Sequence, residues 1–335
     1  MSFQSLSQQR NNWLLRLLGL LLLVVLLARV DLAQVGDIFR EANLWLILAA
    51  VLIILLLIFV KTIRWQGVMR AQGTQLPIWP AYTTYFASLF IGFLTPGRLG
   101  EFVRALQVSQ ACKVSSAKAF SSVLADRLFD LYVLLGVGGA ALLILAASQA
   151  EYVVLTGSVV LITFPLFLFI HNKTFAWLQR FGLKLGRPGR KLFSVGGWLY
   201  EMRLGLRQLD ASGVVIAVGL TILAYAIFFG QCYLLARALN LTVGFVTISF
   251  AVALGSLVTL LPISISGLGT REAVIVAYLG TVGVPAESAL SFSLLVFLTF
   301  YVGGGLVGAM AWWINPMPVG PEDSLPNCEV TEWRP

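Results

Sequence analysis

Long uncharged stretches alternate with short basic segments along most of the chain. A helix needs about 20 predominantly apolar residues to cross the hydrocarbon core of a bilayer. Several stretches reach or approach that length. The pattern predicts membrane-spanning helices over residues 13–29, 43–61, 119–148, 152–170, 211–237 and 287–314. We read the first of these, which resembles a signal peptide, as a retained span, because no convincing cleavage site follows it.

Two further apolar segments, 79–118 and 244–283, do not fit a single straight crossing. The first is interrupted by the sequence TPG and the second by PISISGLGTRE. Broken helices persist inside a bilayer only where they are buried in protein or line a water-filled cavity. The sequence therefore predicts two re-entrant hairpins. Ordinary short spans with a different topology are the alternative.

The positions of Lys and Arg predict how the chain is oriented. Linker 61–75 has three basic residues and no acid, and linker 171–210 has eight basic residues against two acids, so both should be cytoplasmic. Three full crossings between them cannot return the chain to one side, which favours entry of 79–118 from the cytoplasm. The second hairpin then enters from outside, the pattern of inverted repeats in transporters. Both termini are expected in the cytoplasm.

Two polar segments complete the predicted organisation of one transmembrane domain over residues 1–315. Linker 174–209 mixes basic and aromatic residues, which suits an amphipathic helix lying on an anionic leaflet. A solvated loop is the alternative. The tail, residues 316–335, is short, acidic and rich in proline, and we expect it to be disordered.

Composition excludes several classes of protein. The chain is 59% hydrophobic and 11% charged, whereas a soluble domain has roughly 25% charged residues. The net charge is +8, and the basic residues that produce it lie mainly between apolar segments. This placement indicates a role in membrane orientation rather than nucleic-acid binding. A single histidine excludes a multi-histidine metal centre, and neither GxGxxG nor a phosphate-binding P-loop sequence is present. We expect no metal and no cofactor.

Charged residues follow the first break directly. Thr95 before Pro96 is a favourable helix start, and residues 98, 101 and 104 then share one helical face. Free N–H groups of a helix start and two guanidinium groups together suit a phosphate. The predicted headgroup site comprises the side chains of Arg98, Glu101 and Arg104 and the backbone of Thr95, Pro96, Gly97 and Gly100. The alternative is a loop whose charges only fix topology.

A second group of charges, Asp126, Arg127 and Asp130, lies near the start of span 119–148. Charges at such a place are costly unless they are paired or face a cavity. Arg127 can pair with Asp130 one helical turn away, and the acids can pair with Arg98 or Arg104 across the hairpin. We expect all three to contribute to the headgroup site. A purely structural ion pair is the alternative.

The third group lies in the second break. Arg271 and Glu272 are the only charges between Arg237 and Glu287, and isolated charges inside a membrane segment indicate a functional site. We expect Ser266 or Thr270 to cap the helix that follows, and the two glycines to allow tight turns. The backbone positions assigned to this turn and helix start are Ser266, Gly267, Gly269 and Thr270. A structural turn is the alternative.

Three segments together resemble a known family. FIGFLTPGRLGEFVRA (90–105), SSVLADRLFDL (121–131) and LPISISGLGTREA (261–273) resemble the flippase-like membrane region of lysylphosphatidylglycerol synthases, a region that also occurs alone in UPF0104 proteins. The resemblance covers roughly residues 10–314. It implies a polytopic membrane protein that moves or binds a lipid. Aminoacyl transfer is not expected, because the soluble catalytic domain of the full-length synthases is not found in this chain.

These observations favour an all-α integral membrane protein of the bacterial cytoplasmic membrane that acts as a lipid flippase or lipid transporter. The resemblance implies a phospholipid, a polyprenyl phosphate or a hopanoid-type lipid as partner. A homo-oligomer or a lipid-modifying enzyme is a further candidate partner. Two other functions stay open. One is a transferase acting on lipid-linked sugars, with Glu101, Asp126 or Asp130 as general base. The other is a scaffold that recruits an enzyme through linker 174–209.

Overall fold

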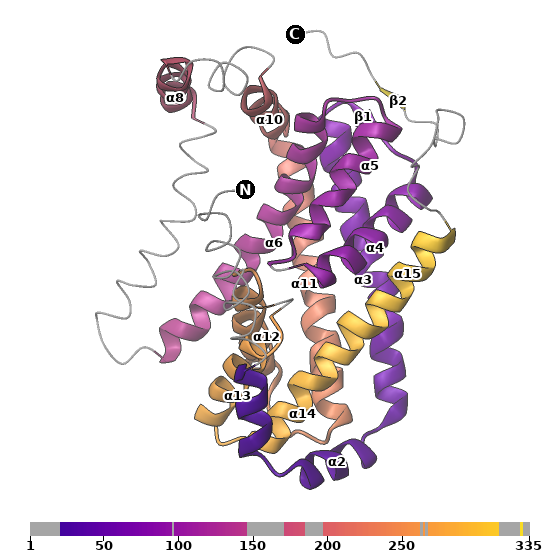
Figure 1. Ribbon diagram of the computed structural model, residues 1–335, viewed down its shortest axis with the longest axis vertical. Helices are drawn as coiled ribbons and strands as arrows, with labels where there is room; N and C mark the ends of the chain where they lie inside the picture. The colour runs from indigo at the N-terminus through magenta and orange to yellow at the C-terminus, as the bar shows by residue number, and fades with distance from the viewer. Residues whose placement is uncertain are drawn as a thin grey trace, which may run out of the picture.

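The structure, a computed structural model, is an elongated bundle of helices (Figure 1). It describes residues 21–95, 97–145, 171–184, 197–261, 264, 267–314 and 329–330. Helices make up nearly all of this part of the chain, which confirms the all-α prediction. The predicted span 13–29 is described only from Leu21, and the predicted span 152–170 lies outside the described residues.

Among the residues that the structure describes, four helical segments are long and apolar enough to cross a membrane. They are α3 (Leu44–Ala71), α6 (Ser116–Leu145), α11 (Ala211–Ala238) and a composite segment, Ala286–Ala311. The composite segment joins α14 (Ala286–Phe297), a π-helical turn η2 (Leu298–Gly303) and α15 (Gly304–Ile314). These helices confirm a polytopic membrane protein.

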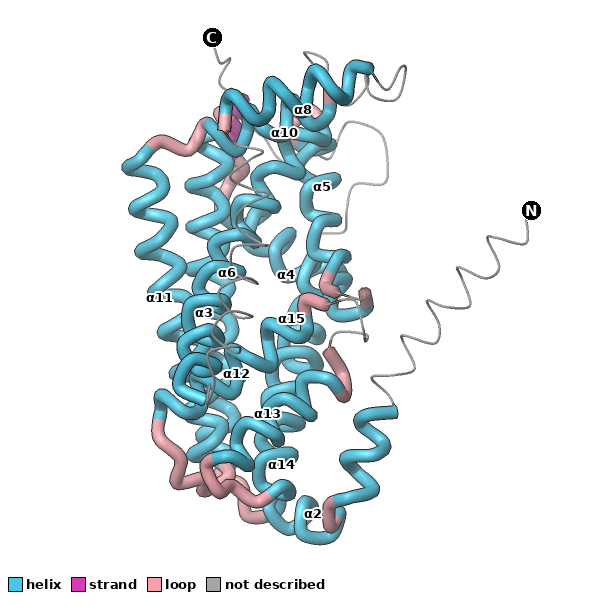
Figure 2. Tube along the Cα trace, turned by 90° about the vertical axis from the view of Figure 1, so that its left-hand side faces the viewer, coloured by secondary structure: helices cyan, strands magenta, loops and turns pink. Residues whose placement is uncertain are grey.

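Each of the two interrupted segments divides into helices that fold back on one another. The first contains α4 (Ile78–Leu94), the short 3-10 helix η1 (Leu99–Phe102) and α5 (Val103–Ala111), and both η1 and α5 pack against α4. The second contains α12 (Phe245–Thr259) and α13 (Thr270–Thr281), which pack together. Figure 2 shows the first hairpin in the upper half of the molecule and the second in the lower half.

Smaller elements lie at the two ends of the bundle (Figure 2). The helix α2 (Leu32–Arg40) lies at one end, and α8 (Asn172–Lys184) and α10 (Trp198–Arg207), both from the predicted interfacial linker, lie at the other. Two tail residues form β2 (Glu329–Val330), which pairs antiparallel with β1 (Thr74–Gln75). The rest of the tail lies outside the described residues.

The structure corrects the interpretation of residues 61–75 as a linker. Helix α3 continues through this segment, Gly67 included, to Ala71, and the chain turns only at Gly73, which has a positive φ of 69°. Trp65 and Met69 are one helical turn apart, and both are buried at 1% exposure or less. The basic residues Lys61 and Arg64 therefore lie inside a spanning helix rather than in a loop.

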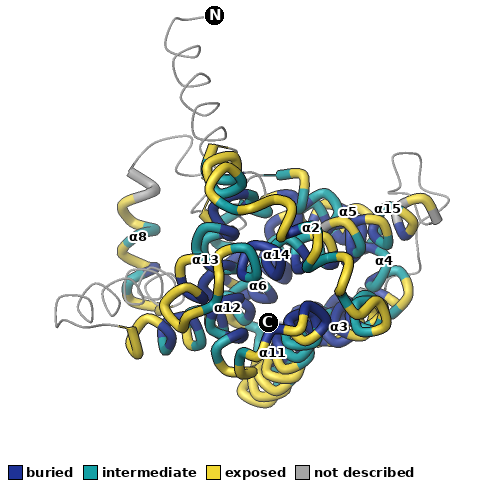
Figure 3. The backbone as a smooth tube through the Cα atoms, turned by 90° about the horizontal axis from the view of Figure 1, so that it is seen from below, coloured by how far each residue is buried: buried dark blue, intermediate teal, exposed yellow. Residues whose placement is uncertain are grey.

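The outer surface of the bundle is apolar. The outward side of α11 is exposed along its length (Figure 3), and Val215, Ile216 and Ile222 on it are 70%, 62% and 60% exposed. A continuous apolar surface of this kind is unfavourable in water. It matches the hydrocarbon core of a bilayer, where polar groups are instead turned inward.

Candidate functional site

A cluster of buried charges occupies the interior between α3, α4, α5 and α6. Asp126 of α6 lies at its centre and is completely buried. Its Oδ1 accepts a hydrogen bond from Arg64 Nε at 2.8 Å, and its Oδ2 accepts one from Arg104 Nη2 at 2.6 Å. The hydroxyl of Tyr85 donates to the same Oδ2 at 3.1 Å. Charges removed from water in this way need such pairing, because each loses several kcal/mol of hydration.

Asp130, one turn further along α6, forms the second centre of the cluster. Its Oδ1 accepts from Arg64 Nη1 at 2.9 Å, and its Oδ2 lies 2.9 Å from Lys61 Nζ and 3.3 Å from Arg127 Nη2. The same Nη1 of Arg64 also donates to the hydroxyl of Thr221 on α11, at 3.0 Å. Side chains of α3 and α6 thus converge on this carboxylate, and Arg64 links it to α11.

Glu101 connects the first hairpin to this cluster. Its Oε2 lies 2.6 Å from Arg127 Nη1, and the residue is completely buried. Two glycines make this close approach possible. A Cβ at Gly92 would collide with the side chain of Glu101, and a Cβ at Gly100 would lie 2.5 Å from the carbonyl oxygen of Ile91. The short connection therefore holds Glu101 tightly against α4.

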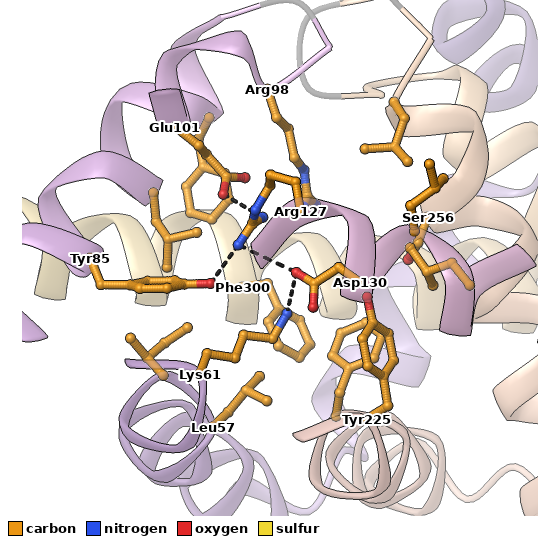
Figure 4. Close-up of a pocket in the computed structure, with 18 of the residues that line it drawn as sticks. Leu57, Lys61, Tyr85, Arg98, Glu101, Arg127, Asp130, Tyr225, Ser256 and Phe300 are labelled. Atoms are coloured by element: carbon orange, nitrogen blue, oxygen red, sulfur yellow. Dashed lines mark hydrogen bonds and ion pairs between the residues drawn. The ribbon is translucent and has the colours of Figure 1, made fainter. Parts of the chain in front are cut away.

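A cavity of about 270 Å³ lies beside the cluster, and residues from both hairpins line it. This volume is close to the lower end of the range for small-molecule pockets. Its polar lining consists of Lys61, Tyr85, Arg98, Glu101, Arg127, Asp130, Tyr225, Ser256 and Arg271. The remaining wall is mostly apolar and includes Leu57 and Phe300. Figure 4 shows Lys61 and Arg98 reaching into this space from opposite sides.

The first break positions Arg98 in an unusual backbone conformation. Gly97 and Arg98 have positive φ angles of 60° and 56°, a region that costs a residue with a Cβ on the order of 1–2 kcal/mol. The expected helix start at Thr95 and Pro96 is wrong. Thr95 ends α4, and η1 begins at Leu99 after Arg98. Pro96 itself lies outside the described residues.

The second break carries its own charged pair. Arg271 and Glu272 form a buried ion pair, and the guanidinium group of Arg271 lies 5.2 Å from the ring centre of Phe297. Thr270 does not provide the expected cap. The backbone N–H of Gly269 donates to Glu272 Oε2 at 2.6 Å, because a carboxylate three residues into a helix can reach back to the helix start.

Thr270 stays close to this turn without capping it. Its hydroxyl donates to the carbonyl oxygen of Gly267 at 3.1 Å and contacts the hydroxyl of Ser264 at 2.9 Å. Gly267 has a φ of 78°, and a Cβ there would collide with Thr259. Both the backbone conformation and the lack of space for a Cβ therefore require glycine at position 267. Ser266 lies outside the described residues.

The structure separates the predicted site residues into two groups. One group lines the cavity and comprises Gly97, Arg98, Glu101, Arg127, Asp130 and Arg271. The other supports the cavity wall from behind and comprises Thr95, Gly100, Arg104, Asp126, Gly267, Gly269, Thr270 and Glu272. The expected pairs Arg104–Asp126 and Arg127–Asp130 are both present, at 2.6 Å and 3.3 Å.

Sequence reasoning missed Lys61, Arg64 and Tyr85. The two basic residues were assigned to a cytoplasmic linker, although their spacing of three places them on one face of a continuing helix. That spacing directly after an apolar run was the available signal. No comparable sequence signal exists for Tyr85, because a single tyrosine in an apolar helix does not indicate which group its hydroxyl contacts. It is completely buried, and it bonds to Asp126 and Arg127.

The fold and the cavity define a class: a polytopic helical membrane protein with a charged cavity between two broken hairpins. Comparison with known families then places the chain. The family described as "Lysylphosphatidylglycerol synthase TM region" matches residues 13–308, and the chain belongs to this family. The resemblance seen in the sequence is thereby confirmed.

Similar proteins occur in archaea. A UPF0104 membrane protein of Methanothermobacter thermautotrophicus is 21% identical over 86% of this chain and 91% of its own length. A UPF0104 membrane protein of Methanocaldococcus jannaschii is 22% identical over 90% of this chain and 94% of its own length. The glycosyltransferase AglD of Haloferax volcanii is 29% identical, but over only 39% of this chain and 22% of its own length. No solved structure matches.

Proposed function

We propose that this protein is a lipid flippase or lipid transporter that binds a phosphate-containing headgroup in the cavity between the two hairpins. One observation carries the proposal. Residues that flank both breaks, Arg98 and Arg271, line the same cavity. Broken helices in membrane transporters similarly place binding sites where the two repeats meet.

The charge of the cavity favours an anionic headgroup. Its lining contains four basic residues, Lys61, Arg98, Arg127 and Arg271, and two acidic residues, Glu101 and Asp130. Guanidinium groups bind phosphate through two parallel hydrogen bonds. The mostly apolar remainder of the wall suits the lipid portion next to the headgroup. Lipid acyl chains would stay in the bilayer while the headgroup crosses.

The residues behind the cavity have a positioning role in this proposal. Arg104 and Asp126 are completely buried, pair with each other and do not line the cavity. Glu272 caps the start of α13 and so fixes the position of its neighbour Arg271. We therefore assign headgroup contact to Arg98, Arg127 and Arg271, and support to the residues behind them.

Membrane orientation is part of the proposal. The first hairpin would enter from the cytoplasm and the second from the opposite side. Both termini and the α8–α10 segment would lie on the cytoplasmic side of the cytoplasmic membrane. The hairpins lie in opposite halves of the molecule (Figure 2), which supports entry from opposite sides. Cysteine accessibility at α2 and α8 in intact cells tests this orientation.

Native mass spectrometry of the gently extracted protein tests headgroup binding. The wild type should retain a phospholipid or polyprenyl phosphate, and the double variant Arg98→Ala/Arg271→Ala should lose it. The control is Arg70→Ala, which removes an exposed arginine of α3 outside the cavity and should retain the lipid. Equal lipid retention by all three proteins would contradict the proposed site.

A second candidate function is a transferase acting on lipid-linked sugars. Glu101 favours it, because this carboxylate lines the cavity. Its Oε2 pairs with Arg127, while its Oε1 has no hydrogen-bond donor among the described residues and could accept a proton from a bound substrate, as a general base would. Partial similarity to a glycosyltransferase points the same way. A new glycolipid formed by purified protein from a lipid-linked sugar, and absent with Glu101→Gln, would replace the transporter proposal with this one.

A further inference from the structure

Within the part of the chain that the structure describes, the cations and acids of the buried cluster are unequal in number. Four basic residues, Lys61, Arg64, Arg104 and Arg127, are linked through contacts of 3.3 Å or less to three acidic residues, Glu101, Asp126 and Asp130. With every group ionised, the cluster carries one positive charge in excess. An excess charge buried in an apolar bundle is unfavourable, and it is relieved most directly by release of one proton.

Of the four basic residues of the cluster, Lys61 is the one that can release this proton. Guanidinium groups stay protonated in proteins, whereas a lysine ammonium group can become neutral when it is buried. Asp126 and Asp130 are each held by two or more guanidinium groups, which favours their ionised form. The arrangement therefore makes Lys61 the expected site of proton exchange.

Lys61 also has the right position. Its Nζ lies 2.9 Å from Asp130 Oδ2, and the side chain lines the cavity. Facing it are Asp130 and Arg127 from α6, Tyr225 from α11 with its ring centre 5.0 Å from Nζ, Tyr85 from α4 across the cavity, and Arg64 from its own helix. η2 contributes Phe300 to the lining. Asp130 also pairs with two guanidinium groups, so its negative charge stays compensated when Lys61 is neutral.

We infer that Lys61 couples headgroup movement to the movement of one proton. This inference rests on the proposed function. In the empty cavity the neutral amine of Lys61 balances the cluster. An anionic headgroup that enters adds one negative charge, and Lys61 then takes a proton from cavity water to restore the balance. When the headgroup leaves on the other side, the proton leaves Lys61 for water there. Lipid and proton move together, and the cycle transfers no net charge.

The coupling predicts a definite distribution of lipid. With one proton per headgroup, a gradient of one pH unit should maintain about a tenfold ratio of transported lipid between the leaflets. The lipid should accumulate in the leaflet that faces the alkaline side, because the proton moves down its gradient. A membrane potential alone should have no effect on this ratio.

Proteoliposomes containing the full chain and a few per cent of fluorescent phosphatidylglycerol test the inference, with dithionite quenching to report the outer leaflet. The wild type should show the tenfold ratio. Lys61→Arg keeps the charge but cannot release it, and it should move the probe without responding to the gradient. Lys61→Gln should likewise lose the response. The control is Lys118→Arg, the same exchange on α6 outside the cavity, and it should respond like the wild type.

The outcomes separate the two proposals. Movement of the probe by the wild type with no response to the pH gradient overturns the coupling and leaves the transporter standing. An unchanged response in both Lys61 variants overturns the role of Lys61. If the wild type does not move the probe at any pH, the transporter proposal fails for phosphodiester lipids, and the coupling fails with it. Circular dichroism and size-exclusion profiles identify a variant that has not folded, in which case the other Lys61 variant decides.

Discussion

The two hairpins position their charged residues in different ways. The acid of the first hairpin, Glu101, pairs with Arg127 of a different helix. The acid of the second, Glu272, pairs with its neighbour Arg271 and caps its own helix. The charged residues of the first hairpin therefore belong to a network that also joins α3 and α6, whereas the charged pair of the second lies within its own helix. A change in the network should consequently affect the whole bundle, and a change in the second hairpin should stay local.

The largest expected effect comes from Asp126→Asn. This change leaves the guanidinium groups of Arg64, Arg104 and Arg127 facing a neutral side chain, and breaking a buried pair on one side costs about 3–5 kcal/mol. Thermal unfolding of the detergent-purified protein measures the loss. The control is Asp37→Asn, which breaks the exposed pair with Arg40 and should cost less than about 1 kcal/mol. Equal effects would contradict the network.

The next largest expected loss of stability comes from glycine-to-alanine changes, which compare how tightly the two hairpins are packed. Gly100→Ala brings a methyl group to 2.5 Å from the backbone oxygen of Ile91, and such overpacking costs about 1–3 kcal/mol. Gly255→Ala brings one to 2.9 Å from the side chain of Arg271, which can move. It should cost less. The same unfolding measurement compares the two, and a larger effect at Gly255 would show that the second hairpin is the more rigid.

The comparison also shows what the sequence could predict. The breaks in both hairpins were identified, because proline and glycine interrupt apolar runs visibly. The partner of Asp126 across the bundle was only partly identified. Arg104 was named, but Arg64 lies 62 residues away on a helix whose end was placed too early. Apolar periodicity fades where a helix contains buried charges, so the pattern ended at Lys61 although α3 continued.

The helix starts after the breaks were harder to predict. Thr95 and Pro96 have the residue types of a helix start, yet the chain first makes a turn with positive φ at Gly97 and Arg98. In the second break Glu272, three residues into the helix, accepts from the N–H of Gly269, and Thr270 does not provide the cap. Local propensities allow several such arrangements. Contact with the rest of the bundle selects one, and this information is not in the local sequence.

Glu272→Gln should have a smaller effect than the network change. The amide oxygen can still accept from the N–H of Gly269, while the charge on the partner of Arg271 is lost, and we expect a cost of about 1.5 kcal/mol. Amide hydrogen exchange shows which helices are destabilised. Faster exchange should be confined to α13 and the end of α12. Faster exchange in α3 or α6 would contradict the local character of the second hairpin.

The smallest expected change in stability is at Arg98, where two substitutions distinguish the role of the residue in the turn from its role in lipid binding. Because Arg98 has a φ of 56°, Arg98→Gly relieves the strain of that turn and should be roughly 1 kcal/mol more stable than Arg98→Ala. Both variants lack the guanidinium group, so each should lose bound lipid in native mass spectrometry. If Arg98→Gly kept its lipid, the role of Arg98 would be to form the turn rather than to contact the headgroup. Equal stability of the two variants would show that the surrounding contacts of the hairpin do not hold residue 98 in this conformation.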